Sequence, residues 1–128
     1  MKTLIVFDTN ILVSALWRRP SNAAHIIDLV AANYLQPCHN AQILTEYKSV
    51  LLRPRLKFSA NDVNNLLDLI IKEGISILSP ISTIPFVDES DRKFYDVARS
   101  CGAILITGNT KHYPKEPFIL KPAEFLEL

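Results

Sequence analysis

The sequence predicts an α/β protein whose mainly parallel sheet is covered by helices on both faces. Short apolar runs typical of strands alternate with segments whose apolar residues recur every three or four positions, as in helices. No hairpin signal joins two strands, so each strand is expected to reach the next through a helix. A chain of 128 residues has the size of one domain, and we expect residues 1–128 to form one.

The first third of the chain predicts two strands and two helices. Thr3–Phe7 is a continuous apolar run rich in β-branched residues, which is typical of a strand buried on both faces. Helical spacing follows over Ile11–Trp17 and Ala23–Ala32. Tyr34–Cys38 predicts a short strand, and Pro37 indicates that this strand lies at an edge of the sheet or is ending, because proline donates no ladder hydrogen bond.

Capping residues define two helices in the middle of the chain. Asn40 is expected to cap a helix over residues 41–52. Ser59, with Asp62 three positions later, resembles a capping box that begins a helix, and Gly74 is expected to end it. Both helices are therefore predicted from local signals alone.

The last third returns to the alternation of strands and helices. Gly102 is expected to end a helix, and a second buried strand follows it directly. The expected elements are strands over 75–78, 103–107 and 119–121, a helix over about 90–100, and a terminal helical turn that begins at Pro122.

Composition excludes several classes of protein. Hydrophobic residues make up 48% and charged residues 21%, which is ordinary globular composition and excludes disorder. The 14 basic and 13 acidic residues give a net charge of +1, which excludes a polycation but leaves a local basic patch possible. The longest apolar run has only four residues, so no membrane span or signal-peptide core fits, and we expect a cytoplasmic protein.

Cysteine, histidine and glycine patterns exclude further classes. Cys38 and Cys101 are far apart in the sequence and form no CxxC motif, so we expect free buried thiols in preference to a disulfide or a reactive thiol. The three histidines have no zinc spacing with these cysteines. The three glycines assemble neither a GxGxxG fingerprint nor a P-loop.

Two carboxylates stand at positions that face the interior. Asp8 directly follows the most apolar strand, so it lies at the carboxyl edge of the sheet, where parallel sheets carry their sites. A role as a turn or cap residue is the alternative. Glu46 follows Ile43 by three residues and precedes Val50 by four, which places it on the inward face of its helix. Arg53 shares that face, and an ion pair with it is the purely structural interpretation of Glu46.

A third inward carboxylate lies in the helix near residue 90. Asp91 precedes Phe94 by three residues and so continues the apolar stripe of that helix. Asp96 falls on the other face with Arg92 and Arg99, and we expect it to form surface ion pairs. Asn109, in the Thr107-Gly-Asn segment that follows the second buried strand, belongs either to a simple turn or to the same site.

Three acids near one edge of a sheet indicate a cation. Crowded carboxylates repel one another, and their pKa values rise unless a cation joins them. Oxygen ligands favour Mg²⁺ or Mn²⁺ over zinc, and such ions suit hydrolysis of a phosphodiester by activating water and stabilising the leaving oxygen. Five basic side chains near the same edge would contact phosphates or would simply be solvated: Arg53, Arg55, Lys57, Lys111 and His112.

With these residues in place, the chain resembles PIN-domain proteins, most closely the toxin-like (VapC-like) branch found in bacterial and archaeal toxin–antitoxin systems. The opening Asp-Thr-Asn alone is a weak signal, but several motifs in order at family-like distances are a strong one. The matching segments are Leu4–Ala15, Ile43–Tyr47, Val50–Arg55, Asp88–Ala98, Ile106–His112 and Ile119–Leu126.

The resemblance implies a three-layer α/β/α sandwich and ribonuclease activity that depends on Mg²⁺ or Mn²⁺. Asp8, Glu46 and Asp91 match the metal-site acids of the family. Asn109 matches a fourth position at which many relatives carry Asp, so this chain has one negative charge fewer, which argues against a second tightly held ion. The supporting polar positions of the family are matched by Thr9 and Thr107. A homodimer and an antitoxin partner that blocks the active cleft are also implied.

Other functions are kept as alternatives. Asn109 is compatible with a catalytically weak or inactive PIN module that binds RNA or a protein partner. A haloacid-dehalogenase-like phosphatase needs an Asp two residues after Asp8, where this chain has Asn10. A response-regulator receiver needs an Asp at the end of its third strand, and residues 75–80 contain none. The sequence therefore favours a metal-dependent ribonuclease.

Overall fold

A computed structural model describes residues 2–128 and contains a five-stranded sheet in which all neighbouring strands run parallel. The strands are β1 (Thr3–Phe7), β2 (Leu35–His39), β3 (Ile75–Ser76), β4 (Ile104–Ile106) and β5 (Ile119–Leu120). They lie in the order β3-β2-β1-β4-β5, so the most apolar strand is central. This order brings the carboxyl ends of β1 and β4 next to each other.

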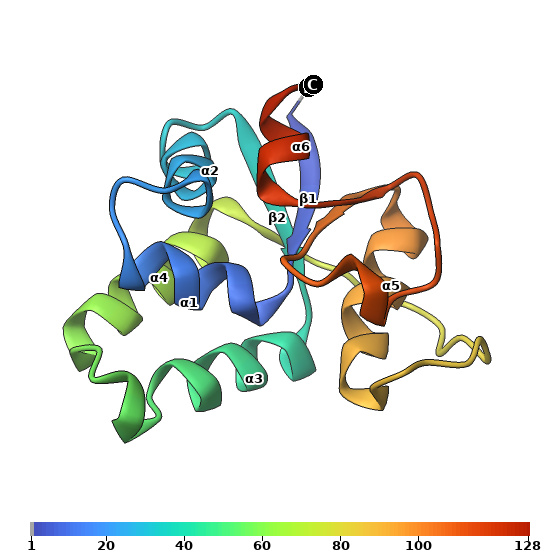
Figure 1. The fold of residues 1–128 in the computed structure, drawn as a ribbon, viewed down its shortest axis with the longest axis horizontal. Helices are drawn as coiled ribbons and strands as arrows, with labels where there is room; N and C mark the ends of the chain where they lie inside the picture. The colour runs from blue at the N-terminus through green and yellow to red at the C-terminus, as the bar shows by residue number, and fades with distance from the viewer. Residues whose placement is uncertain (1) are drawn as a thin grey trace.

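Helices cover both faces of the sheet and complete three layers. The α-helices are α1 (Thr9–Trp17), α2 (Asn22–Ala31), α3 (Ala41–Leu51), α4 (Ala60–Glu73), α5 (Arg92–Cys101) and α6 (Pro122–Leu126). Figure 1 shows α1, α2 and α4 on one side of the strands and α5 on the other. The predicted α/β/α class is confirmed. Within residues 2–128, no helix combines the length and the apolar character that crossing a bilayer requires.

Local capping signals explain where several helices begin and end. The side-chain oxygens of Ser21, Asn40 and Ser59 each accept a hydrogen bond from the backbone N–H three residues later, at 3.0, 2.9 and 3.1 Å. Gly102 ends α5 in the left-handed conformation with φ 72°, which a glycine adopts without steric cost. The two caps predicted for α3 and α4 are therefore confirmed.

Pro37 predicted that the second strand lies at an edge of the sheet or is ending; the edge position is wrong, and the strand continues for two residues beyond Pro37. β2 lies between β1 and β3, and Pro37 is paired in register with Ile5 of β1. The carbonyl of His39 accepts from the Ile77 N–H on the β3 side, and strand alternation turns the backbone of Pro37 to that same side. β3 has only two residues and pairs with Cys38 and His39, so its ladder begins beyond Pro37. An interior proline is tolerated because its neighbouring strand is so short.

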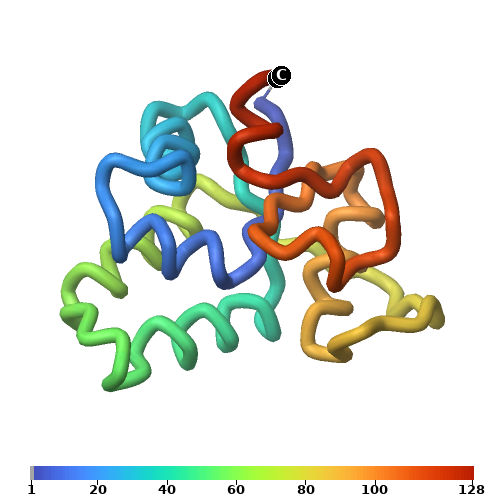
Figure 2. The backbone as a smooth tube through the Cα atoms, viewed as in Figure 1, coloured from blue at the N-terminus to red at the C-terminus, as the bar shows by residue number. Residues whose placement is uncertain are grey.

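The prediction that Asp96 forms surface ion pairs is also wrong. Asp96 is buried, and its Oδ2 accepts a hydrogen bond from the Ser82 N–H at 3.1 Å. Arg92 donates to the Ser82 carbonyl and hydroxyl, both at 2.8 Å, and forms its salt bridge with Glu89. These bonds hold the irregular segment 77–88 against α5, along which it runs in Figure 2. A segment without periodicity thus buries a helix face that looks solvent-exposed in the sequence.

The two cysteines, distant in the sequence, are in contact. Cys38 on β2 is buried, Cys101 at the end of α5 is half-buried, and both are free thiols. The Cys101 thiol donates to the Val97 carbonyl at 3.1 Å. The proximity of the two thiols raises the pKa of Cys38 and lowers the pKa of Cys101 to about 7. Both thiols are free, as predicted, but the predicted burial is confirmed only for Cys38. Cys101 is half-buried and has the more acidic thiol of the two.

Candidate metal centre

Asp8 is fixed at the carboxyl end of the central strand. Its backbone N–H donates to the Ile106 carbonyl at 2.9 Å, which continues the β1–β4 ladder by one residue. Its side chain makes no capping bond to α1, although it stands at the N-cap position. Instead, Oδ2 accepts hydrogen bonds from the Thr107 hydroxyl at 2.8 Å and the Tyr113 hydroxyl at 2.9 Å. A buried carboxylate is thereby oriented by two donors that lie about one hundred residues away in sequence.

Glu46 reaches the same edge from α3. The helix is anchored by the next residue, Tyr47, whose hydroxyl donates to the Phe7 carbonyl at 2.6 Å. The Oε2 atom of Glu46 accepts a hydrogen bond from the Thr9 hydroxyl, and Oε1 lies 2.6 Å from the Lys93 ammonium. The ion pair predicted as the structural alternative, with Arg53, is therefore replaced by one with Lys93.

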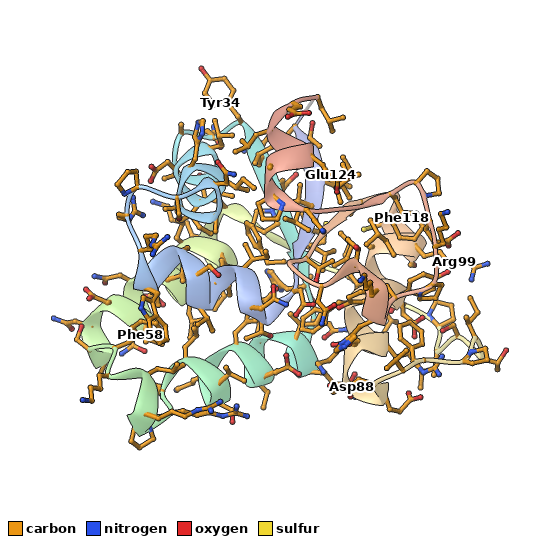
Figure 3. All side chains as sticks on the ribbon, in the orientation of Figure 1. Tyr34, Phe58, Asp88, Arg99, Phe118 and Glu124 are labelled. Carbon is orange, nitrogen blue, oxygen red and sulfur yellow. The ribbon has the colours of Figure 1, made fainter. Side chains whose placement is uncertain are left out.

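Asp91 comes from the turn that leads into α5. It ends a short 3₁₀ helix, Glu89–Asp91, and its side chain is only 14% exposed. The Asp88 carboxylate, labelled in Figure 3, accepts from the Ser90 N–H at 3.0 Å and shapes this turn. His112 Nδ1 lies 3.7 Å from Asp91 Oδ2, so the imidazole is the nearest basic neighbour of this carboxylate in the described part of the chain.

The three acids are close enough to perturb one another. Burial raises the pKa of Asp8, and the charge of Glu46 raises it further, while the bonds from Thr107 and Tyr113 oppose the rise. Burial also raises the pKa of Asp91 to about 6, with added contributions from the charges of Asp8, Asp88 and Glu46. The cluster therefore holds excess negative charge in a partly dry setting, which a cation would relieve.

Asn109 supports this cluster through its backbone. Its N–H donates to the Thr107 hydroxyl oxygen at 3.1 Å, and that hydroxyl in turn donates to Asp8. The Asn109 side chain is half-buried and carries no charge. The fourth predicted position thus lies beside the acids, and it adds no negative charge to them.

The basic residues named from the sequence are not gathered at one place. A cavity of about 800 Å³ between α3 and the start of α5 is lined by Glu46, Lys93 and Arg53, among others. Lys111 lines a different hollow, of about 390 Å³, near Tyr113. Arg55 and Lys57 are exposed beyond the end of α3. Of the five basic residues predicted from the sequence, Arg53 alone shares a cavity with one of the acids, and His112 alone lies within 4 Å of one.

Two residues of this cluster were missed by the sequence analysis. Lys93 follows Asp91 by two positions on the same turn of chain, and its ammonium returns to Glu46. Tyr113 lies in the loop after β4 and reaches Asp8 through its hydroxyl. Neither position carries a helical or strand periodicity signal. The sequence contains one signal for them: Lys93 lies two residues after the predicted metal ligand Asp91, and Tyr113 lies two residues after Lys111, a predicted phosphate contact.

The donor set fits a hard divalent cation. Asp8, Glu46 and Asp91 supply carboxylate oxygens, which Mg²⁺ and Mn²⁺ prefer. The pKa values of Asp8 and Asp91 are raised, so a positive charge bound beside them would stabilise their ionised forms. In the described part of the chain, no three His, Cys, Asp or Glu side chains are already spaced to bind an ion. Both Glu46 oxygens already have a partner, Thr9 or Lys93, so Glu46 has fewer free lone pairs for a metal ion than an unpartnered carboxylate has.

A parallel three-layer sheet with carboxylates gathered at the carboxyl edge of its central strands defines the class of protein: an α/β protein with an acidic site suited to a divalent cation. The chain belongs to the PIN domain family, whose model matches residues 4–111. Proteins of this family are generally metal-dependent nucleases. The chain is also similar to an uncharacterized protein of Methanocaldococcus jannaschii, with 30% identity over 112 residues that cover 85% of this chain and 72% of the relative.

Proposed function

We propose that this PIN-domain protein is an endoribonuclease that hydrolyses single-stranded RNA with Mg²⁺ or Mn²⁺ and leaves a 5′-phosphate and a 3′-hydroxyl. One observation carries the proposal. Asp8, Glu46 and Asp91 come from three different elements, yet Asp8 and Glu46 both contribute to the raised pKa of Asp91. No packing requirement of the fold explains why three acids should be assembled at this edge.

The chain's own residues would prepare the site for reaction. A bound divalent ion would supply the positive charge that activates water and neutralises the phosphodiester. Thr107 and Tyr113 orient Asp8, and Thr9 orients Glu46. Burial and the Asp8 charge raise the pKa of Tyr113, so its hydroxyl stays protonated and remains a donor to Asp8.

The RNA backbone would approach through the cavity between α3 and α5. Glu46 and Lys93 lie in its wall, and Arg53 supplies a further positive charge for phosphate. His112 lies beside Asp91 and Lys111 lines the separate hollow near Tyr113, and both would contact neighbouring phosphates. Arg55, exposed beyond α3, would extend this path.

The resemblance to toxin-like PIN proteins supports a role as the toxin of a toxin–antitoxin system in the cytoplasm. This role includes a homodimer and an antitoxin protein that covers the cleft. Expression of the chain should arrest growth, and co-expression of the product of a neighbouring gene should relieve the arrest. Arrest by an Asp8→Asn variant to the same degree would contradict a role for RNA cleavage in it.

Cleavage of a labelled single-stranded RNA tests the proposed activity. The purified chain should cut with Mn²⁺ and Mg²⁺ and should stop cutting when EDTA is added. An Asp91→Asn variant should keep its fold and lose the activity, whereas Asp68→Asn, at an exposed position on α4, should retain it. Cleavage that survives in Asp91→Asn would refute the proposal.

A second candidate function is an inactive PIN module that binds RNA or a protein partner. The neutral Asn109 and the ion pair of Lys93 with Glu46 favour it, because both reduce the negative charge available to a metal. This function predicts RNA binding that does not change with Mg²⁺ and no cleavage by folded protein. Metal-dependent cleavage lost in Asp91→Asn excludes it.

A further inference from the structure

Lys93 is held inside the acidic cluster by three separate contacts. Its ammonium lies 2.6 Å from Glu46 Oε1 and also donates to the Ser90 carbonyl. It stands 5.0 Å from the centroid of the Phe94 ring, a distance at which a cation is attracted by the aromatic face. The Lys93 side chain is only 16% exposed, which is unusual for lysine. The ammonium is thus a fixed charge at this position.

The contacts of the three acids divide the cluster into two parts. Glu46 has both oxygens engaged, one by Thr9 and one by Lys93. On Asp8, by contrast, both hydroxyl donors bond to a single oxygen, Oδ2. Among residues 2–128, the basic atom nearest to Asp91 is His112 Nδ1, at 3.7 Å, which is beyond hydrogen-bond distance. Asp8 and Asp91 are therefore better placed than Glu46 to take a metal ion.

The net charge of the cluster also separates Glu46, which is paired with Lys93, from Asp8 and Asp91. Three ionised carboxylates with one ammonium leave two net negative charges, which one divalent ion neutralises. A further ion would need another carboxylate at the cluster. Asn109 at the fourth position is neutral, and Asp88, whose charge also reaches Asp91, is exposed and accepts two hydrogen bonds from Ser90. Lys93 also lines the cavity between α3 and α5, so a ligand that enters there can contact this residue.

We infer that this site takes a single divalent ion, bound through Asp8 and Asp91, and that Lys93, held by Glu46, is the second cation and contacts the phosphate of the RNA. The inference rests on the proposed nuclease function. It assigns to a side chain the positive charge that a second metal ion would supply. Lys93 is then a catalytic residue, because it touches the substrate.

Mn²⁺ titration without RNA tests the inference separately from the activity. Calorimetry should give one Mn²⁺ per wild-type chain, and two would overturn the inference even if the protein cleaves RNA. Lys93→Met should bind Mn²⁺ at least about tenfold more tightly, because the competing charge is gone and Glu46 is released. Lys72→Met, at an exposed position on α4, is the matched control and should bind like wild type.

Cleavage at saturating Mn²⁺ should move in the opposite direction. Lys93→Met should cut RNA about a hundredfold more slowly although it holds metal more tightly, and Lys93→Arg should recover part of the rate. Unchanged Mn²⁺ affinity in Lys93→Met would show an ordinary ion pair and overturn the inference. Faster cleavage would show that Lys93 only blocks the site, which also overturns it.

Three outcomes remain distinguishable. If Lys93→Met fails to fold, as judged by circular dichroism, the wild-type stoichiometry still decides between one ion and two. If the wild-type chain binds one Mn²⁺ but cleaves no RNA, the proposed function fails and the catalytic role of Lys93 fails with it. If it cleaves RNA with two ions bound, the proposed function stands and the inference about Lys93 is wrong.

Discussion

Asp91 destabilises the metal-free fold at neutral pH. Its pKa is about 6 in the folded protein against 3.8 for an ordinary aspartate, chiefly because it is buried. The folded state therefore holds this proton more tightly, and the free energy of unfolding falls as pH rises through that interval. At neutral pH, Asp91→Asn should be more stable than wild type by about 1–3 kcal/mol.

Urea unfolding in EDTA at several pH values between about 4 and 8 checks this prediction. The gap between Asp91→Asn and wild type should open as pH rises, because only the wild-type chain must ionise a half-buried carboxylate. Asp68→Asn, at an exposed site, should follow the wild-type curve. A constant gap at every pH would show that the charge of Asp91 is not its cause.

His39 should give a pH dependence of the opposite sign. Its side chain is buried at the end of β2, and neither ring nitrogen has a hydrogen-bond partner among residues 2–128. Burial lowers the pKa of His39 from 6.5. Below about pH 6.5, the imidazole is therefore protonated in the unfolded chain but stays neutral in the folded chain. Stability that is full above about pH 6.5 is lost as pH falls.

His39→Leu removes that proton uptake. Between about pH 7.5 and 5 the free energy of unfolding of this variant should fall less steeply than that of wild type. The comparison needs the same urea titrations, with His25→Leu as a control at an exposed position of α2. Parallel wild-type and His39→Leu curves would mean that His39 protonates in the folded state.

At the scale of single residues, the sequence indicates which side chains face inward, but it does not indicate which partner a long side chain reaches. Helical spacing and the end of an apolar strand correctly placed Asp8 and Asp91 toward the interior. The same spacing does not show that the ammonium of Lys93 returns to α3, because that depends on how α3 and α5 pack. Nor does it show that the Tyr113 hydroxyl reaches Asp8, because an irregular loop positions it.

At the scale of elements, Gly74 is required by a close approach and not by its backbone angles. It follows α4 with φ −98°, which any residue can adopt. A Cβ atom there would lie 2.6 Å from the Pro37 carbonyl oxygen and closer still to that of Ile70, and neither backbone atom can move independently. Gly74→Ala should therefore lower the free energy of unfolding by about 2–4 kcal/mol.

Gly102→Ala is the informative comparison for this change. Gly102 has φ 72°, but nothing lies within 4 Å of the position of its Cβ. The substitution should cost only the strain of a left-handed alanine, about 1–2 kcal/mol. Chemical denaturation of both variants measures the difference. A larger loss in Gly102→Ala would show that contact with Pro37 and Ile70 does not constrain the junction of α4 and β3.

Local signals predict elements well and their neighbours poorly. Asn40 and Ser59 define helix starts because a side-chain oxygen and a backbone N–H three residues later are all that a cap requires. The errors at Pro37 and Asp96 have another origin. Each depends on a distant partner, the two-residue strand β3 in one case and Ser82 in the other. No periodicity within β2 or α5 contains that information.

At the scale of the whole molecule, the acidic cluster joins elements that no local segment contains. Asp8 extends from β1, Glu46 from α3 and Asp91 from the start of α5, while Thr107 and Tyr113 follow β4. Bringing these groups together places like charges near one another, and the packing of the core must offset that repulsion. A ligand that neutralises the cluster should therefore stabilise the fold as a unit.

Mn²⁺ should accordingly raise the melting temperature of the chain. An ion that binds only the folded state adds about 2.7 kcal/mol when its concentration is a hundred times its dissociation constant. For a domain of this size, that is an increase of about 10 °C. Calorimetric scans should show the rise with Mn²⁺, its reversal by EDTA and no rise with NaCl of equal ionic strength. The Asp91→Asn variant should melt at a higher temperature than wild type without metal. Mn²⁺ should then raise its melting temperature by only a small fraction of the wild-type increase, because the substitution has already removed the repulsion that the ion relieves. An undiminished increase in that variant would place the ion outside the cluster.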